Sequence, residues 1–161
     1  MSLALANNGA TIFVVDSAQP RIVALNREGE ELERFSLPPQ MTQPTAISVV
    51  NSQIYVLGNF RHIVGEFSPG GRYRREFRWD GIRATGAFAF DSRRHLYFVA
   101  DARLTLIRVF AEDGTPLSSF GQRGEAVDQM QRVDAIHVDS RGRVYLVDKR
   151  RGKVLVFAPE P

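Results

Sequence analysis

The chain has no cysteine, and only three methionines and one tryptophan occur among its 161 residues. Without cysteine it forms no disulfide, no thiolate metal site and no cysteine nucleophile. It lacks an apolar run of about eighteen residues, which a membrane-spanning helix needs. Its first residues also lack the basic segment of a secretory signal peptide. These absences predict a soluble chain and leave its cellular compartment open.

The sequence motifs of several enzyme classes are missing as well. The chain has no nucleophile elbow, P-loop, dinucleotide fingerprint or HExxH motif. Gly121 and Gly124 lack the strand-then-helix setting of a phosphate loop, so we interpret this stretch as a link. The net charge of +3, from 21 basic and 18 acidic residues, is a mild excess. We therefore expect no cofactor and favour a protein that is not an enzyme.

What the sequence does contain is an internal repeat. Three landmarks recur with the same spacings of 42, 43 and 47 residues. An aromatic landmark occurs at Phe13, Tyr55, Phe98 and Tyr145. A turn landmark occurs at Asp16, Gly58, Asp101 and Asp148, and a closing apolar residue at Leu25, Phe67, Phe110 and Phe157. A period of this size with several short strands is typical of a β-propeller.

Short apolar or alternating segments between turn residues predict the strands of each repeat. The first repeat, residues 3–44, has strands at 3–6, 12–15, 22–25 and 31–35. The second, residues 45–86, has strands at 46–49, 54–57, 64–67 and 73–77. The third, residues 87–134, has strands at 87–90, 97–100 and 107–110 and one that ends at Phe120. The fourth, residues 135–161, has strands at 135–138, 144–147 and 154–157 and no outer strand.

Turn residues support this division. Gly29, Gly71 and Gly114 precede the outer strands at the spacing of the repeat, and hairpin turns of this kind need a positive φ. Prolines 38, 39 and 44 separate the first two repeats. No segment has a sustained helical period. The chain is thus predicted to be all-β, a single domain of four blades of which the last is incomplete.

The stretch from Phe120 to Phe157 resembles an NHL repeat. The matching parts are the glycine link after Phe120, a strand ending at Asp139, an aromatic strand ending at Asp148 and a closing apolar strand. The third repeat matches nearly as well and the first two less well, since Gly58 replaces an aspartate in the second. The resemblance implies blades whose first strands line a central channel. It also implies that inter-blade links and second-to-third-strand turns share one face, here called the link-and-turn face.

NHL propellers usually close with six blades, and this chain has fewer than four complete ones. An open or partial ring exposes the apolar flanks of its first and last blades. The chain is then part of a longer protein, or copies of it complete one another, or a partner supplies the missing blades. A closed four-bladed ring is the fourth alternative.

The candidate binding residues lie on the link-and-turn face. They are Arg61, His62, Arg83, Arg103, Arg123, Arg132, Asp134, Lys149, Arg150 and Arg151. We interpret the chain as a non-catalytic module that binds a protein or peptide or associates with itself, because variable loops on a rigid frame usually carry function. Binding of single-stranded RNA through the same arginine-rich face is an alternative, which the NHL resemblance also suggests.

A lyase-like or lactonase-like metalloenzyme is the third alternative. His137 and Asp134 are its candidate channel residues, since the preceding repeats have Ser48 and Ala89 in place of His137. The three histidines of the chain are not expected to converge, so the sequence predicts no zinc site. Asp16, Asp101 and Asp148 end corresponding strands, where we expect them to cap turns rather than to hold calcium.

Overall fold

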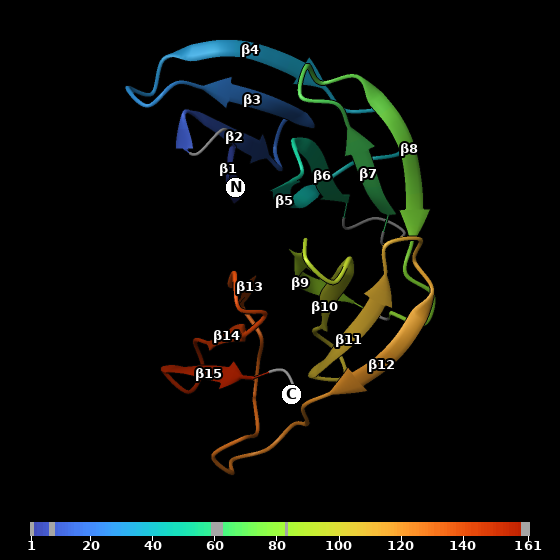
Figure 1. Cartoon of the computed structure of the whole chain (residues 1–161), viewed down its shortest axis with the longest axis vertical. Coiled ribbons are helices and arrows are strands. Elements are labelled where there is room, and N and C mark those ends of the chain that lie inside the picture. Colours follow the sequence, from blue (N-terminus) through green and yellow to red (C-terminus); the bar gives the residue numbers. More distant parts are fainter. Residues whose placement is uncertain (1, 7–8, 59–62, 83, 159–161) are drawn as a thin grey trace. The chain divides into compact units, whose positions relative to one another are not determined.

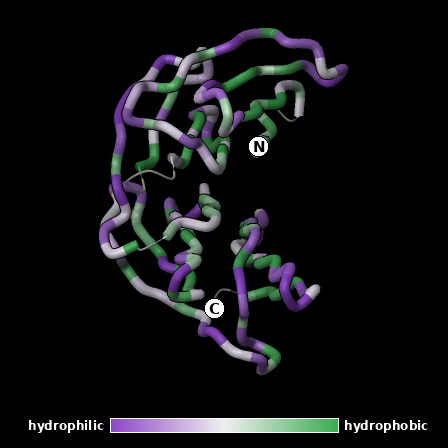
Figure 2. The backbone as a smooth tube through the Cα atoms, turned by 180° about the vertical axis from the view of Figure 1, so that it is seen from behind, coloured by the Kyte–Doolittle hydropathy of each residue, from purple (hydrophilic) through white to green (hydrophobic). Residues whose placement is uncertain are grey.

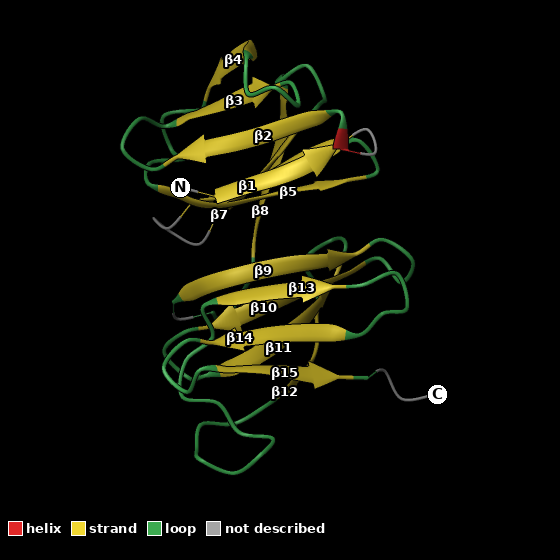
Figure 3. Cartoon of the chain, turned by 90° about the vertical axis from the view of Figure 1, so that its left-hand side faces the viewer, coloured by secondary structure: helices red, strands yellow, loops and turns green. Residues whose placement is uncertain are grey.

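The computed structural model describes residues 2–6, 9–58, 63–82 and 84–158. The described residues form fifteen β-strands in four antiparallel sheets and no α-helix (Figure 1). The short segment coloured as helix in Figure 3 is a 3₁₀ turn at Gly9. Among them there is no helix long and apolar enough to cross a membrane. The chain divides into two compact units, Met1–Arg78 and Trp79–Pro161, and each contains two sheets.

The first unit contains two four-stranded sheets. The strands of the first sheet are β1 (Ser2–Ala6), β2 (Thr11–Asp16), β3 (Arg21–Leu25) and β4 (Glu31–Ser36). Those of the second are β5 (Pro44–Val50), β6 (Gln53–Gly58), β7 (Ile63–Phe67) and β8 (Tyr73–Arg78). In both sheets each strand pairs with the next along the chain, which is the meander of a propeller blade.

The second unit contains a four-stranded and a three-stranded sheet. The strands of the first are β9 (Thr85–Asp91), β10 (Leu96–Asp101), β11 (Leu106–Ala111) and β12 (Pro116–Phe120). Those of the second are β13 (Ala135–Val138), β14 (Val144–Asp148) and β15 (Lys153–Phe157). The predicted strands are confirmed to within two residues at their ends, and so is the absence of an outer strand after β15 among the described residues. The fold is an all-β propeller type with four blades.

Turn geometry explains why the chain reverses where it does. Gly29, Gly71 and Gly114 have φ of 84°, 71° and 90°, as the hairpin prediction requires. The N–H of Gly71 donates to the carbonyl of Ser68 over 2.9 Å and closes the turn before β8. A Cβ at Gly71 would overlap the ring of Phe35, so space as well as φ demands glycine there.

One segment differs from the expectation. Pro44 is predicted to lie in the link between the first two repeats, but it is the first residue of β5 and is paired with Gly58. A proline is tolerated there because the first position of a strand does not have to donate to the ladder. The register shifts between Pro44 and Ala46, so the regular pairing begins after the proline.

Alternation along the strands builds the core of each unit. In the first unit, Phe13, Val15 and Ile22 of the first blade pack with Ile54 and Phe67 of the second. The outer strand β4 is largely hydrophilic (Figure 2), and its side chains are mostly exposed. Since successive side chains point to opposite faces, each blade has one face in this core and another outside it.

In the second unit a corresponding core joins the two blades. Phe98, Ala100 and Ile107 of one blade pack with Val144 and Leu146 of the next. Trp79 is 2% exposed and lies against the rings of Tyr97 and Phe110. Both units therefore use the same arrangement, in which one face of a blade covers the opposite face of the next.

Candidate functional site

The link-and-turn face of the second unit is built by hydrogen bonds between the link 121–134 and the β14–β15 turn. Asp148 Oδ2 accepts the N–H of Gln131 over 2.6 Å, and Asp134 Oδ2 accepts the N–H of Lys149 over 3.0 Å. Asp148 is 1% exposed, so its carboxylate is a buried anchor. The link donates in the first of these hydrogen bonds and accepts in the second. Together they hold the link on the turn.

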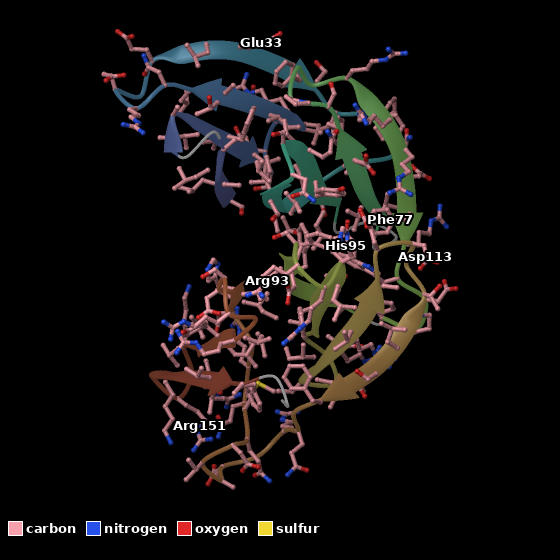
Figure 4. All side chains as sticks on the ribbon, in the orientation of Figure 1. Glu33, Phe77, Arg93, His95, Asp113 and Arg151 are labelled. Carbon is pink, nitrogen blue, oxygen red and sulfur yellow. The ribbon has the colours of Figure 1, made fainter. Side chains whose placement is uncertain are left out.

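Arg151 strengthens this attachment. Its Nη1 donates to the carbonyls of Ala126 and Gln129 over 2.8 and 2.7 Å, and its Nη2 donates to that of Glu125 over 2.5 Å (Figure 4). One guanidinium thus satisfies three carbonyl groups of the link. Arg151 is a structural part of the face, and its donors are directed at the protein itself.

The other basic residues of this face are exposed. Arg132 pairs with Asp134, with 2.8 Å between Nε and Oδ1, and its side chain is 69% exposed. Arg103, Arg123, Lys149 and Arg150 are exposed as well. Val127, at 83% exposure, is an apolar side chain in the same link. Arg61, His62 and Arg83 lie outside the described residues.

The strand-ending aspartates cap turns, as predicted. Asp16 Oδ1 accepts the N–H of Ala18 over 2.9 Å. Asp101 Oδ1 accepts the N–H groups of Arg103 and Leu104, and Asp148 Oδ1 that of Arg151. These bonds stay within two or three residues of each aspartate, which is the geometry of an Asx-turn.

The two candidate channel residues are engaged differently. The carboxylate of Asp134 is held by Arg132 and the N–H of Lys149, as described above. His137 is exposed on β13, with its ring centroid 6.5 Å from that of Tyr145. Within the described part of the chain no three His, Cys, Asp or Glu side chains are grouped as a metal site requires.

A second surface is the exposed flank of the last blade. In the register of β13, β14 and β15, Ala135 lies opposite Val147 and Val154, and His137 lies opposite Tyr145 and Val156. Directly opposed residues share a face. We call these six residues the last-blade flank. Val154 and Val156 are 61% and 52% exposed, although they are apolar.

The same positions are buried in the preceding blade. There the corresponding residues, by register, are Ala87, Ala100, Ile107, Ala89, Phe98 and Val109. Every one of them is at most 9% exposed. Five of the six belong to the core that joins the two blades of the second unit. The last-blade flank therefore has the composition of a covered blade face, with His137 in place of alanine.

The first blade has an exposed flank of the opposite kind. Its residues, by register, are Leu3, Val14, Val23, Leu5, Ile12 and Leu25, which we call the first-blade flank. The corresponding residues of the second blade are Ile47, Val56, Gly65, Val49, Ile54 and Phe67. Apart from Gly65, these side chains pack on the first blade. Leu3 and Leu5 are 61% and 58% exposed.

One cluster of polar residues is not among the sequence predictions. The tripeptide Asp-Ser-Arg occurs twice, beginning at Asp91 and at Asp139, in the first-to-second-strand turns of neighbouring blades. With Arg94 these turns line a cavity of about 180 Å³. The repeated tripeptide was the available signal. The tripeptide alone indicates an ordinary turn. Only the packing of the two neighbouring blades brings its two copies together.

The architecture defines a class, the β-propellers, and comparisons with solved structures agree. A streptogramin B lyase structure matches with a TM-score of 0.70 and 12% identity over 98% of this chain and 54% of the other. The selenomethionine-substituted virginiamycin B lyase from Staphylococcus aureus matches with 0.69 and 16%, over 100% and 56%. U3-55K matches with 0.65 and 14%, over 99% and 52%.

These likenesses show the fold alone. The chain spans about half the length of each of these three structures. No protein-family model matches the chain, and no curated protein matches it by sequence. The NHL resemblance accordingly stays a prediction, while the propeller fold is established.

Proposed function

We propose that the chain is a non-catalytic protein-binding and scaffolding module whose first partner is a second copy of itself. In this proposal the last-blade flank of one copy packs against the first-blade flank of the next. One observation supports it above all: both flanks have the residue types that neighbouring blades bury against each other within each unit.

Burial of apolar side chains supplies most of the free energy of this association. Full burial of a leucine or valine side chain contributes about 1.5–3 kcal/mol. Leu3, Leu5, Val154 and Val156 are all more than half exposed, so their burial supplies the main favourable term. The half-length match to solved propellers favours a second copy, because two copies together have about the length of one such propeller.

The link-and-turn face is the second part of the proposal. Its exposed cations, Arg103, Arg123, Arg132, Lys149 and Arg150, suit an acidic segment of a protein partner. Because Arg151 donates to carbonyls of the link 121–134, it has fewer donors for a nucleic-acid backbone. This favours the protein-binding interpretation over the RNA-binding one.

Light scattering on a size-exclusion column tests the self-association. We expect a mass well above the 18.1 kDa of one chain. The double variant Val154→Asp/Val156→Asp should run as a monomer. The matched control is Leu32→Asp/Leu117→Asp, which adds the same two charges at apolar side chains that are 59% and 55% exposed outside both flanks. A wild-type monomer at all concentrations, or equal effects of the two variants, would contradict the proposal.

A further inference from the structure

The cavity beside the two Asp-Ser-Arg turns has features of a ligand site that the proposed function does not use. Its lining consists of Asp91, Arg93, Arg94, Arg141 and Gly142. We call it the turn cavity. Its residues come from the β9–β10 and β13–β14 turns, and all lie within the second unit.

Local geometry explains how the arginines come together. Asp91 Oδ1 and Asp139 Oδ1 each accept the N–H of the residue two positions later, Arg93 and Arg141, over 2.9 Å. The two turns are therefore built alike. The Nη1 of Arg93 donates to the carbonyl of Ser140 over 2.7 Å and so joins one turn to the other (Figure 4).

Arg94 lies directly over the second turn. Gly142 has a φ of +78°, and a Cβ there would lie 3.0 Å from Cζ and Nη1 of Arg94. Glycine at this position thus serves two purposes, since it allows the left-handed turn and leaves room for the guanidinium. Arg141, the neighbour of Gly142, is exposed at the mouth of the same cavity.

Asp91 supplies an acceptor in this basic surrounding. Its side chain is 3% exposed, and Oδ1 caps the turn. Its other oxygen, Oδ2, is buried without a hydrogen bond from the described residues. The Nη1 of Arg94 is 3.8 Å away, which is an ion-pair distance and too long for a hydrogen bond. A buried carboxylate oxygen in this state is an available acceptor.

The charges then define the ligand. Asp139 is neutralised by Arg143, whose Nε lies 2.7 Å from Oδ2. The turn cavity is therefore lined by three guanidinium groups, those of Arg93, Arg94 and Arg141, and by one carboxylate, that of Asp91. Guanidinium groups bind tetrahedral oxyanions through paired N–H donors. A carboxylate acceptor in the same cavity repels an oxyanion without protons and accepts a hydrogen bond from a protonated one.

We propose that the turn cavity binds a phosphate group that still carries a proton. Arg93, Arg94 and Arg141 hold its charged oxygens, and Asp91 Oδ2 accepts a hydrogen bond from its P–OH group. A second cavity, of about 410 Å³, shares Asp91 and Arg93 with the first and extends to Phe90 and His137. It has room for the organic part of a phosphomonoester.

Isothermal titration calorimetry on the full chain tests the site. Inorganic phosphate and sulfate are compared at equal ionic strength and about pH 6.5, where phosphate retains protons and sulfate does not. We expect phosphate to bind at least tenfold more tightly than sulfate. Arg141→Ala should weaken phosphate binding at least fivefold, while Arg74→Ala, which removes an exposed arginine of the outer strand β8, should leave it unchanged.

Asp91→Asn tests the role of the acceptor. Asparagine keeps one oxygen for the turn and replaces the other by a donor, so the preference for phosphate over sulfate should disappear. Circular dichroism confirms that the variant is folded. The proposal is overturned if phosphate and sulfate bind equally to the wild type, if neither binds, or if Arg141→Ala and Arg74→Ala act alike.

Phosphoserine, compared with inorganic phosphate at about pH 5, where both retain a proton, distinguishes the two sources of such a group. Tighter binding of phosphoserine than of inorganic phosphate means that the second cavity holds the organic part, as for a phosphorylated protein or metabolite. Tighter binding of inorganic phosphate assigns the site to the free anion. The self-association of the flanks does not depend on either result.

Discussion

Asp148 Oδ2 accepts the backbone N–H of Gln131 over 2.6 Å, across seventeen positions of the chain. The same carboxylate caps its own turn through Oδ1 and the N–H of Arg151. One buried side chain thus connects a turn inside the last blade with the link that leads into it. It also explains why an aspartate ends this strand, because the two tasks need two acceptor oxygens.

Asp148→Asn should therefore destabilise the protein. Asparagine has one acceptor oxygen for two N–H donors, so either Gln131 or Arg151 loses its partner. An unsatisfied buried donor costs about 1–3 kcal/mol, and we expect the free energy of unfolding in urea to fall by that amount. Asp128→Asn removes an exposed carboxylate from the same link and is expected to leave the free energy of unfolding unchanged.

Acid should weaken the β13–β14 turn in a predictable direction. Burial raises the pKa of Asp139, but hydrogen bonds from the backbone and side chain of Arg143, the N–H of Arg141 and the hydroxyl of Tyr145 hold it well below 3.8. A carboxyl group with a lowered folded-state pKa stabilises the fold above its unfolded pKa of about 4 and loses this contribution as the pH falls.

Urea unfolding between neutral pH and about pH 3 checks this. The wild type should lose stability below about pH 4, and Asp139→Asn should lose less over the same range. The pKa of Asp148 is also lowered, since the hydrogen bonds to its carboxylate outweigh burial, so part of the wild-type slope remains in the variant. An identical slope in both proteins would show that Asp139 is not responsible.

The sequence allowed much of the fold to be predicted because the repeat fixes what local patterns leave open. Alternation identified the strands, and recurrence at a common spacing separated true turns, such as those at Gly29 and Gly71, from isolated glycines. The capping role of Asp101 and Asp148 followed from the same reasoning. These features depend on residues that are close in sequence. The backbone geometry of such short segments varies little, so it can be predicted from residue type and spacing.

The roles of several arginines were beyond prediction. Arg151 was expected to be a surface binding residue, but it contacts carbonyls 22 to 26 positions earlier in a link without a regular pattern. The link has no repeat counterpart that would reveal this contact. Likewise, Arg93 of the third blade donates to the carbonyl of Ser140 in the neighbouring fourth blade. Such contacts depend on how blades pack, and strand patterns alone do not encode that.

The flank of the last blade leads to a prediction about His137. The corresponding residue is Ala4 in the first blade and Ala89 in the third, both small. Burying an imidazole without a partner costs about 1 kcal/mol or more. His137→Ala should therefore tighten self-association about fivefold. Sedimentation equilibrium measures the dissociation constant, and weaker association of the variant would argue against this surface.

The first unit indicates which residues meet in the proposed interface. There the N–H of Ile47 donates to the hydroxyl of Ser2 over 3.3 Å, so β1 lies beside β5. By register, Ala135 corresponds to Ser2 and Leu3 corresponds to Ile47. Ala135 of one copy should therefore lie beside Leu3 of the next.

Oxidative cross-linking of single-cysteine variants tests the central claim most directly, because the chain has no cysteine of its own. Ala135→Cys and Leu3→Cys are prepared separately, mixed and oxidised. We predict a disulfide-linked pair containing one chain of each variant, with little of either homodimer. Absence of the mixed pair, together with a rapid disulfide within single chains of the double variant, would contradict the account and indicate a ring closed by one chain.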